Sequence, residues 1–416
     1  MSKRIYLCLA HMSEAGMEQK YIQEAFDTNW VVPLGPNVNA FEDELKAFCG
    51  CSREVVALAS GTAAVHLALI ACGVERGDEV IVQSFTFCAS TNPVVYLGAT
   101  PVLVDSERDS WNIDPDLMEY AIKERISKTG RKPKAIIAVA LYGMPYRIDR
   151  IMEIANRYDI PLIEDVAEGM GSTFDGRVIG TFGRYGILSF NGNKMITTSG
   201  GGALLCPDDE ARKYAMFLAT QARDGYPYYQ HTEIGYNYRM SNVCAGIGRG
   251  QMTVLEQHLS HHRHVHDLYV ELFRDIDGIT LRSDTFDSRC RSNYWLNTIL
   301  LDPALNIEGQ EHAYEQAVNG AVGGAAGMVR QGGTLHTDVE PNANVEALRC
   351  VLDKADVEAR PLWKPMHCQP VYKDAPAYVN GVSESLFHRG LCLPSGPCVS
   401  DDEVRYIVET IKKAIR

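Results

Sequence analysis

The chain has 416 residues, of which 46% are hydrophobic and 22% charged, and its formal net charge is −13 at pH 7. This length and composition indicate a globular protein with a large domain and a smaller one. The acidic balance disfavours a nucleic-acid partner or an anionic membrane surface, because both are bound through basic faces.

Export and membrane insertion are also disfavoured. The apolar run before His11 and Ser13 is too short for a signal peptide, and no run has the length of a membrane-spanning helix. The 12 cysteines are scattered without a CxxC pair, which is typical of reduced core residues. We therefore expect a cytoplasmic protein.

Short apolar strands alternate with helices in the first half of the chain. A helix at 17–26, an extended loop at 29–38 and a helix at 41–48 come first. Strands are then expected at 54–59, 79–83, 100–105, 135–142, 161–165 and 185–190, and helices at 63–72, 115–126 and 148–158. This alternation predicts an α/β fold with a mostly parallel sheet, whose ligands gather at the carboxyl ends of the strands.

The pattern after Gly202 favours helices, and a long polar helix at 254–275 leads away from the sheet. We place the domain boundary there, with a large α/β domain over 1–260 and a smaller α+β domain over 261–416. The smaller domain is expected to hold a strand at 294–301 and a helix at 402–415. The Gly- and Ala-rich stretch within 308–344 predicts an inserted surface segment rather than a phosphate loop, because it lacks the GxxxxGK[ST] motif.

One lysine stands out in YGILSFNGNKMITTSGGGAL, residues 185–204. Lys194 follows a buried-looking strand in a polar turn, where its ammonium would be poorly hydrated. Such a lysine suits Schiff-base chemistry, whereas a solvated surface charge is the ordinary alternative.

A phosphate seat is the second feature. Gly61, Thr62 and Ala63 lie at a strand-to-helix junction, where unpaired amides and the positive helix end bind anions, although Thr62 also suits a helix N-cap. Ser189, at the end of its strand, offers a further phosphate donor.

Two more residues suit an aromatic cofactor. Asp165 ends a strand and can pair with a protonated ring nitrogen, or be a structural carboxylate. Phe87 offers a flat face for a ring, or belongs to the core. Phosphate turn, aromatic residue, aspartate, serine and lysine together match the needs of pyridoxal 5'-phosphate.

With these residues in this order, the chain resembles the DegT/DnrJ/EryC1/StrS sugar aminotransferases. These are fold-type I pyridoxal-phosphate enzymes that act on nucleotide-linked keto sugars. The segments that carry the resemblance span nearly the whole chain and include NWVVPLGPNVNAFE, SGTAAVHLAL, GDEVIVQSFTFCASTNPV, PLIEDVAEGMGS, SFNGNKMITTSGGGAL, GYNYRMSNVCAGIGRGQM, EARPLWKPMH and GLCLPSG.

The resemblance implies roles for individual residues. It makes Lys194 the Schiff-base lysine and places Asp165 on the pyridine nitrogen and Phe87 against the ring. It assigns the phosphate to Thr62, Ala63 and Ser189. Glu168 falls near the phenolic oxygen, and Asn237 matches an asparagine that reaches the phosphate of the neighbouring subunit. The resemblance thus implies a homodimer with shared sites.

The resemblance also implies a substrate preference. The segments FNGNK, AE after the aspartate and WKPMH look most similar to those of enzymes of the UDP-bacillosamine and GDP-perosamine synthase type. These aminate C4 of UDP- or GDP-linked 4-keto-6-deoxy sugars. The resemblance implies L-glutamate as donor, a ping-pong reaction through pyridoxamine phosphate, and a role in surface polysaccharide or glycan biosynthesis. The expected substrate-binding residues are Asn29, Trp30, Arg239, Arg360, Trp363, Lys364 and His367.

Two other functions remain as alternatives. A sugar dehydratase on the same fold is disfavoured because that branch of the family replaces the lysine with histidine. A non-catalytic sensor or regulatory binding protein is disfavoured because a pure binder has no need for both Asp165 and Lys194. An absorbance spectrum with added pyridoxal phosphate would separate the binder from the enzyme.

The family resemblance does not account for some features of the sequence. LCLAHM, residues 7–12, occupies the place of a Ser-Pro-Pro type run in near relatives, and the 308–344 segment is foreign to the compact family pattern. His258, His262 and His266 recur every four residues on one helix face, as metal ligands or interface residues would. We expect no metal there.

Overall fold

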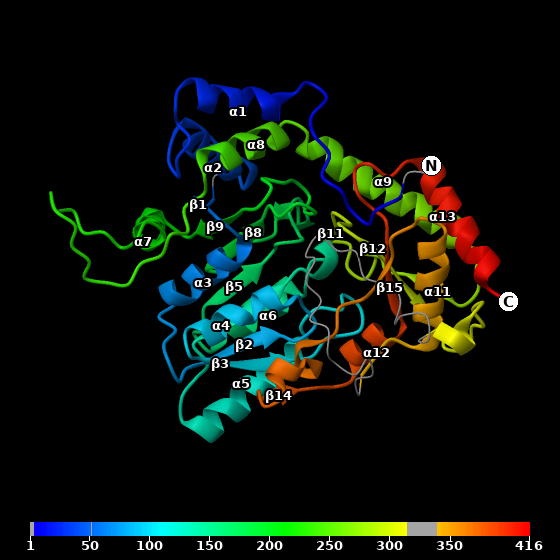
Figure 1. The fold of residues 1–416 in the computed structure, drawn as a ribbon. Coiled ribbons are helices and arrows are strands. Elements are labelled where there is room, and N and C mark those ends of the chain that lie inside the picture. The colour runs from blue at the N-terminus through cyan, green and yellow to red at the C-terminus, as the bar shows by residue number, and fades with distance from the viewer. Residues whose placement is uncertain (1–3, 51, 314–338) are drawn as a thin grey trace.

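A computed structural model describes residues 4–50, 52–313 and 339–416 (Figure 1). Most of the predicted 308–344 insertion, residues 314–338, lies outside the described residues. Its first part includes a short helix η3 (Gln310–His312), and the helix α11 (Ala343–Lys354) begins at its end.

An eight-stranded sheet forms the centre of the larger domain, in the order β1-β9-β8-β5-β4-β2-β3-β14. The strands are β1 (Glu54–Leu58), β2 (Glu79–Gln83), β3 (Thr100–Val104), β4 (Ala135–Val139), β5 (Leu162–Asp165), β8 (Tyr185–Ser189), β9 (Gly202–Cys206) and β14 (Ala377–Tyr378). The strands from β14 to β8 run parallel, and β9 is antiparallel to both its neighbours. The predicted mostly parallel sheet is confirmed.

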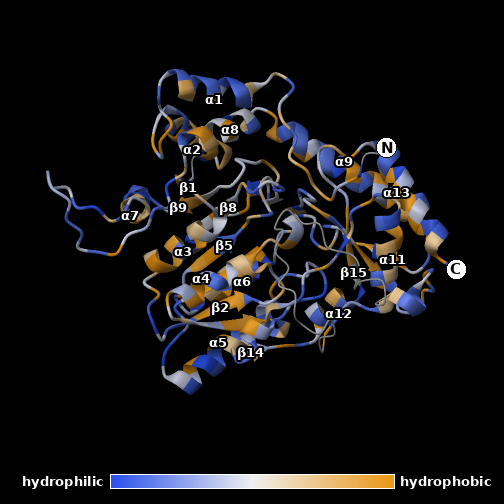
Figure 2. Ribbon diagram, in the orientation of Figure 1, coloured by the Kyte–Doolittle hydropathy of each residue, from blue (hydrophilic) through white to orange (hydrophobic). Residues whose placement is uncertain are grey.

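Helices cover both faces because side chains of each strand alternate between two cores. In β1, Val55 and Ala57 enter one core while Val56 and Leu58 enter the other. The first core is closed by α2 (Pro36–Phe48), α5 (Pro115–Thr129) and α6 (Ile148–Arg157), and the second by α3 (Gly61–Ala71), α4 (Asn92–Tyr96) and α7 (Asp209–Ala219). Figure 2 shows β2 and β5 as hydrophobic strands within this envelope.

Local sequence signals set many helix ends. Asp114 caps α5 by accepting hydrogen bonds from two backbone amides, Pro115 occupies its first turn, and Gly130 ends it at a φ of 70°. Glycine also permits close packing of α8 (Asn242–Met252) on α1 (Met17–Asp27). A Cβ on Gly250 would lie 2.5 Å from the backbone nitrogen of Glu18, so no larger residue fits there without a shift.

The smaller domain is built on an antiparallel sheet of β10 (Ile279–Leu281), β12 (Asn297–Leu301), β15 (Gly390–Leu393) and β13 (Arg360–Pro361). Its core also takes in α9 (Leu255–Phe273), α11 and α13 (Asp401–Ala414). The helix α12 (Val382–Arg389) packs beside it. A separate three-stranded sheet joins β11 (Cys290–Arg291), β6 (Thr173–Phe174) and β7 (Arg177–Val178).

The chain passes between the two domains more than once. Leu259 of α9 packs in the large domain and Val265 in the small one, so this helix crosses the boundary predicted at residue 260. Ile5 pairs with Val357 of the smaller domain, whereas β14, from the C-terminal part, joins the large sheet. The division into 1–260 and 261–416 stays a prediction.

Some expectations about secondary structure were wrong. The segment after Gly202 was expected to be helical, but β9 lies there and pairs with β1 and β8. The loop predicted at 29–38 ends early, because α2 begins at Pro36, where proline suits the first helical turn. No helix among the described residues is both long and apolar enough to cross a membrane.

Candidate active site

Three strands and one helix meet at the carboxyl edge of the large sheet. Asp165 ends β5, Ser189 ends β8, and the segment that carries Phe87 follows β2. The helix α3 starts against the same edge, since a Cβ on Gly61 would lie 3.1 Å from the Cβ of Ser189. Residues that are far apart in sequence thus converge where parallel sheets bind ligands.

Lys194 lies inside this site rather than on the surface. Its side chain is only 13% exposed, and its Nζ is 3.3 Å from Oε1 of Glu168. The ammonium also lies 4.1 Å from the centre of the Trp295 indole ring, which suits a cation–π contact. The alternative of a solvated lysine is therefore wrong.

Asp165 is buried, and its carboxylate accepts fewer hydrogen bonds than its two oxygens can take. Its Oδ2 accepts a hydrogen bond from the Ser90 hydroxyl at 2.7 Å, and its Oδ1 accepts one from the Ala167 amide at 3.1 Å. Burial raises its pKa, while Ser90, Ala167 and the charge of Lys194 lower it. Within the described residues, no lysine, arginine or histidine comes within 4.0 Å of this carboxylate. A buried carboxylate without a close cation fits a protonated ring nitrogen.

Glu168 is the second buried carboxylate of the site. Its Oε2 accepts a hydrogen bond from the Tyr142 amide at 2.7 Å, and burial raises its pKa, opposed mainly by Lys194. Tyr142 has a φ of 54°, in the left-handed region that non-glycine residues rarely adopt. The side-chain amide of Asn293 donates to the carbonyls of Glu168 and Met170, which fixes the Glu168 loop.

Sequence reasoning missed four of these residues. Ser90 belongs to the polar segment after β2, which did mark the site. Trp295 was predicted as part of a strand, but its Nε1 donates to the Asn193 carbonyl at 2.7 Å and its ring faces Lys194. Tyr142 and Asn293 carry no local signal, because their contacts with Glu168 are made across the fold.

The start of α3 lies where the phosphate-binding site was predicted, but its N-cap residue differs from the one expected. Ser60, not Thr62, is the N-cap, and its hydroxyl accepts from the Ala63 amide at 3.0 Å. The amide of Ala63 is thus already bonded within the chain. The amides of Gly61 and Thr62 are those that helix geometry leaves without an intrahelical acceptor, and Gly61 lies beside Ser189.

Phe87 is not a core residue, since its side chain is 53% exposed at the edge of an otherwise buried segment. Its ring lies 5.5 Å from that of Trp363, centre to centre. The Trp363 amide donates to the Tyr142 hydroxyl at 2.9 Å, and the Tyr142 amide donates to Glu168. The WKPMH segment is therefore connected to Glu168 through Tyr142. An exposed aromatic face in the segment that follows β2 at the carboxyl edge of the sheet fits a planar cofactor.

Three expected substrate contacts are occupied by carboxylates of the same chain. Arg239 forms a two-pronged ion pair with Glu42 and is 7% exposed. Arg360 pairs with Glu358 at 2.7 Å. The ring nitrogens of His367 contact the Ser84 hydroxyl and Glu384. The other expected residues differ in exposure: Asn29, Trp30 and Asn237 are exposed, and Trp363 and Lys364 are half-buried.

The three histidines of α9 have separate partners. Nδ1 of His258 contacts the Met195 carbonyl at 3.2 Å, and that of His262 contacts the Tyr294 carbonyl at 3.1 Å. His266 contacts Oδ1 of Asn297 at 2.7 Å. In the part of the chain that the structure describes, their nitrogens do not gather into a set of possible metal ligands. They instead attach α9 to the Lys194 turn and to the Trp295 segment.

A cavity of about 690 Å³ lies at the opposite, amino edge of the sheet. It is lined by Lys134, which precedes β4, by Leu162 at the start of β5 and by Arg184, which precedes β8. This cavity therefore lies at the other end of the strands from Asp165 and does not belong to the site around Lys194.

Known proteins resemble this chain over nearly its whole length. The model of the DegT/DnrJ/EryC1/StrS aminotransferase family matches residues 13–322 and 325–412. The "Putative pyridoxal phosphate-dependent aminotransferase EpsN" of Bacillus subtilis (strain 168) is 42% identical over 415 residues, 99% of this chain and 96% of EpsN. GDP-perosamine synthase of Escherichia coli O157:H7 is 32% identical over 409 residues, 98% of each chain.

Solved structures agree. The crystal structure of a DegT/DnrJ/EryC1/StrS aminotransferase from Brucella abortus has a TM-score of 0.81 and 26% identity, with 96% of this chain and 95% of that chain covered. The predicted fold, enzyme class and pyridoxal 5'-phosphate cofactor are confirmed. The chain belongs to the DegT/DnrJ/EryC1/StrS aminotransferase family, and it is a pyridoxal-phosphate-dependent sugar aminotransferase.

Proposed function

We propose that the chain transfers the amino group of L-glutamate to C4 of a UDP- or GDP-linked 4-keto-6-deoxy sugar, in two half-reactions. The observation that carries this proposal is the full-length similarity to GDP-perosamine synthase, combined with a site whose lysine and two carboxylates are in place. The product would serve polysaccharide or glycan biosynthesis.

The residues that would hold pyridoxal phosphate are those at the carboxyl edge of the sheet. The amides of Gly61 and Thr62 with the hydroxyl of Ser189 would bind the phosphate, and Asp165 the ring nitrogen. Phe87 would cover one face of the ring. Bound there, pyridoxal phosphate withdraws electrons from the carbon that carries the amino group and holds that group between the half-reactions.

Lys194 would carry the proton. With its amine free, Nζ would take a proton from the α carbon of glutamate as general base and return it at the cofactor's aldehyde carbon as general acid. In the second half-reaction it would move a proton the opposite way, onto C4 of the sugar. Trp295 covers the ammonium and excludes water from one side, and Glu168 lies 3.3 Å away. The Tyr142 amide donates to Glu168 and orients its carboxylate toward the ammonium.

Substrate recognition is assigned to the exposed loop of Asn29 and Trp30 and to the segment with Trp363 and Lys364. Both have exposed or half-buried polar and aromatic groups suited to a sugar diphosphate. Arg239, Arg360 and His367 would first have to leave their carboxylate partners, so we assign them no part in binding.

A homodimer with shared sites is part of the proposal. The chain after α7 extends away from the body of the molecule (Figure 1) and exposes Tyr228, Tyr229 and Ile234 by 60%, 79% and 83%. Exposed aromatic residues on such an arm favour a protein partner. Asn237, at the base of the arm, is exposed and would reach the partner's cofactor phosphate.

The test is a glutamate-dependent amination assay with UDP-, GDP- and dTDP-linked 4-keto-6-deoxy sugars, with the amino position assigned by NMR. We expect turnover with a UDP- or GDP-linked sugar and an equatorial or axial amine at C4. Amination at C3, or no turnover with any of the sugars despite a spectrum that responds to glutamate, would contradict the substrate assignment.

Sharing of sites is tested by mixing two inactive variants, Lys194→Ala and Asn237→Asp. A mixed dimer contains one site with both native residues, so unfolding and refolding the mixture should restore activity. If each site were made by one subunit alone, the mixture would stay inactive.

A further inference from the structure

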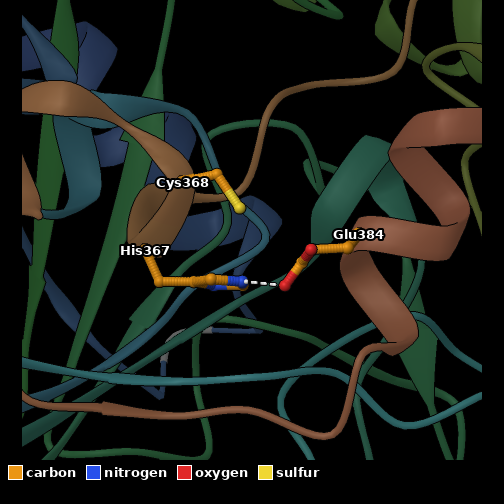
Figure 3. Close-up of side chains that lie close together, drawn as sticks. All are labelled: His367, Cys368 and Glu384. Atoms are coloured by element: carbon orange, nitrogen blue, oxygen red, sulfur yellow. Dashed lines mark hydrogen bonds and ion pairs between the residues drawn. The ribbon is translucent and has the colours of Figure 1, made fainter. Parts of the chain in front are cut away.

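Three potential metal ligands converge where the WKPMH segment meets α12. His367 and Cys368 belong to the short helix η4 (Met366–Cys368), and Glu384 belongs to α12. Figure 3 shows the Cys368 sulfur directed toward the gap between the His367 ring and the Glu384 carboxylate. One ligand atom from each residue lies within 4.8 Å of the other two.

The spacing of these atoms suits a small tetrahedral ion. Nε2 of His367 and Oε1 of Glu384 are 3.1 Å apart. In a zinc site with bonds of about 2.1 Å, nitrogen and oxygen ligands lie about 3.4 Å apart, so little movement is needed to admit the ion. Histidine, thiolate and carboxylate are the ligand types that zinc takes in proteins.

The histidine is already oriented for ligation. The Ser84 hydroxyl lies 2.6 Å from Nδ1, and the same oxygen accepts a hydrogen bond from the His367 amide at 3.1 Å. A partner on Nδ1 fixes the ring and leaves Nε2 for a metal, as the outer partners of zinc-bound histidines do. The His367 side chain is 8% exposed and Glu384 is 41% exposed, so the site is anchored inside and open to solvent.

From these contacts we propose that His367, Cys368 and Glu384 bind one zinc ion per chain, with water as the fourth ligand. The ion would join two parts of the protein. Ser84 follows β2 in the segment that carries Phe87, and α12 begins with the Ser383 amide bonded to Asp105 after β3. Zinc would therefore fasten α12 to the segments that carry Phe87 and Trp363.

The thiol has to lose its proton to become a ligand. In the metal-free protein, burial and then the negative charge of Glu384 raise the pKa of Cys368 to about 12. A bound dication reverses that effect, and the proton is released to solvent as the sulfur–metal bond forms.

Cobalt(II) titration of the cofactor-loaded enzyme tests the proposal, because tetrahedral cobalt has visible bands and a thiolate ligand adds a charge-transfer band. We expect saturation at one equivalent, displacement by zinc, and a raised melting temperature with zinc. Cys368→Ser should remove the thiolate band, and Ser84→Ala should weaken zinc binding by about 10- to 100-fold.

Cys350→Ser is the matched control, because Cys350 also contacts a glutamate, Glu346, at 3.7 Å on α11. It should leave the cobalt spectrum unchanged. Glu384→Gln, a change on a solvent-facing side chain, provides a variant that keeps the fold and should weaken binding at least about tenfold. An octahedral spectrum without a thiolate band, or equal spectra for wild type and Cys368→Ser, would overturn the proposal.

Discussion

Glu164 and Asp165 are neighbours on β5, yet they point to opposite faces of the sheet and have different surroundings. Glu164 is fully buried and accepts hydrogen bonds from the amides of Gly180, Phe182 and Gly183 and from the Tyr146 hydroxyl. Among the residues that the structure describes, Asp165 accepts hydrogen bonds from Ser90 and Ala167 only.

The number of hydrogen-bond donors around each group separates a structural carboxylate from a functional one. Burial raises the pKa of both, so the shift alone does not distinguish them. Donors from the chain surround Glu164, whereas Asp165 lies at the open strand end near Lys194 and has capacity for an external cationic group. The face of β5 that carries Asp165 should therefore control catalysis, and the other face stability.

The largest effect is expected for Lys194 on the catalytic side. Lys194→Ala removes the amine that binds the cofactor and moves the proton, so kcat should fall at least about a thousandfold. Lys194→Arg should do the same, because a guanidinium forms no Schiff base. Single-turnover kinetics and the absorption spectrum with pyridoxal phosphate measure both effects.

Lys46→Ala is the control for Lys194. It removes another lysine–glutamate pair, with Glu54 at 2.6 Å, but one that is partly exposed and outside the site. Its kcat should match that of wild type. Wild-type turnover in either Lys194 variant would refute the assignment.

Asp165→Asn should lower kcat about a hundredfold or more, because a neutral amide no longer stabilises a protonated ring nitrogen. The melting temperature of the cofactor-free protein should hardly change, since the substitution keeps the shape and removes a buried charge. Steady-state kinetics and thermal unfolding measure the two quantities. A large loss of stability with normal kcat would mean that Asp165 is structural.

Glu164→Gln should show the opposite behaviour. The amide nitrogen of glutamine donates where the carboxylate accepted, so at least one of the surrounding amides loses its acceptor. We expect a loss of about 2–3 kcal/mol in unfolding free energy, measured by urea unfolding at fixed protein concentration. At a temperature where the variant is folded, kcat should stay near that of wild type. A selective loss of kcat would contradict the separate roles of the two faces of β5.

The sequence contained enough to predict one half of the site and not the other. Asp165 and Lys194 follow apolar strands directly, and the alternation of strands and helices brings strand ends to one edge. Trp295 contacts Asn193 from 102 positions away, and Asn293 reaches the Glu168 loop from 125. Such contacts leave no periodic pattern in a single sequence.

Long-range packing also produced features that the sequence patterns did not predict. Arg239 has the chemistry of an anion-binding residue, but it already forms an ion pair with Glu42, which lies 197 positions earlier in the sequence. The strand β9 begins in a glycine-rich stretch, and such a sequence is not typical of a strand. It is held by pairing with β1 and β8, and Gly202 lies so close to α3 that a Cβ would be 2.4 Å from the Gly61 nitrogen.

The smallest expected effect concerns a buried histidine whose role we assign to stability. Burial lowers the pKa of His262 to about 3, so it is neutral in the folded protein, whereas its pKa in the unfolded chain is about 6.5. Below pH 6.5 the unfolded chain takes up a proton that the folded one does not. The contribution of His262 is thus fully present above about pH 6.5 and is lost as pH falls toward 3, by about 2 kcal/mol between pH 6.5 and 5.

His262→Asn tests this, because the asparagine amide can still donate to the Tyr294 carbonyl that Nδ1 contacts at 3.1 Å. The difference in urea midpoint between pH 7 and pH 5 should be smaller in the variant than in wild type. His258, His261 and His266, whose pKa values burial also lowers, are unchanged in both proteins and cancel in this comparison. An unaltered pH dependence would mean that the pKa of His262 is nearly the same in the folded and the unfolded chain, and would contradict the pKa lowering by burial.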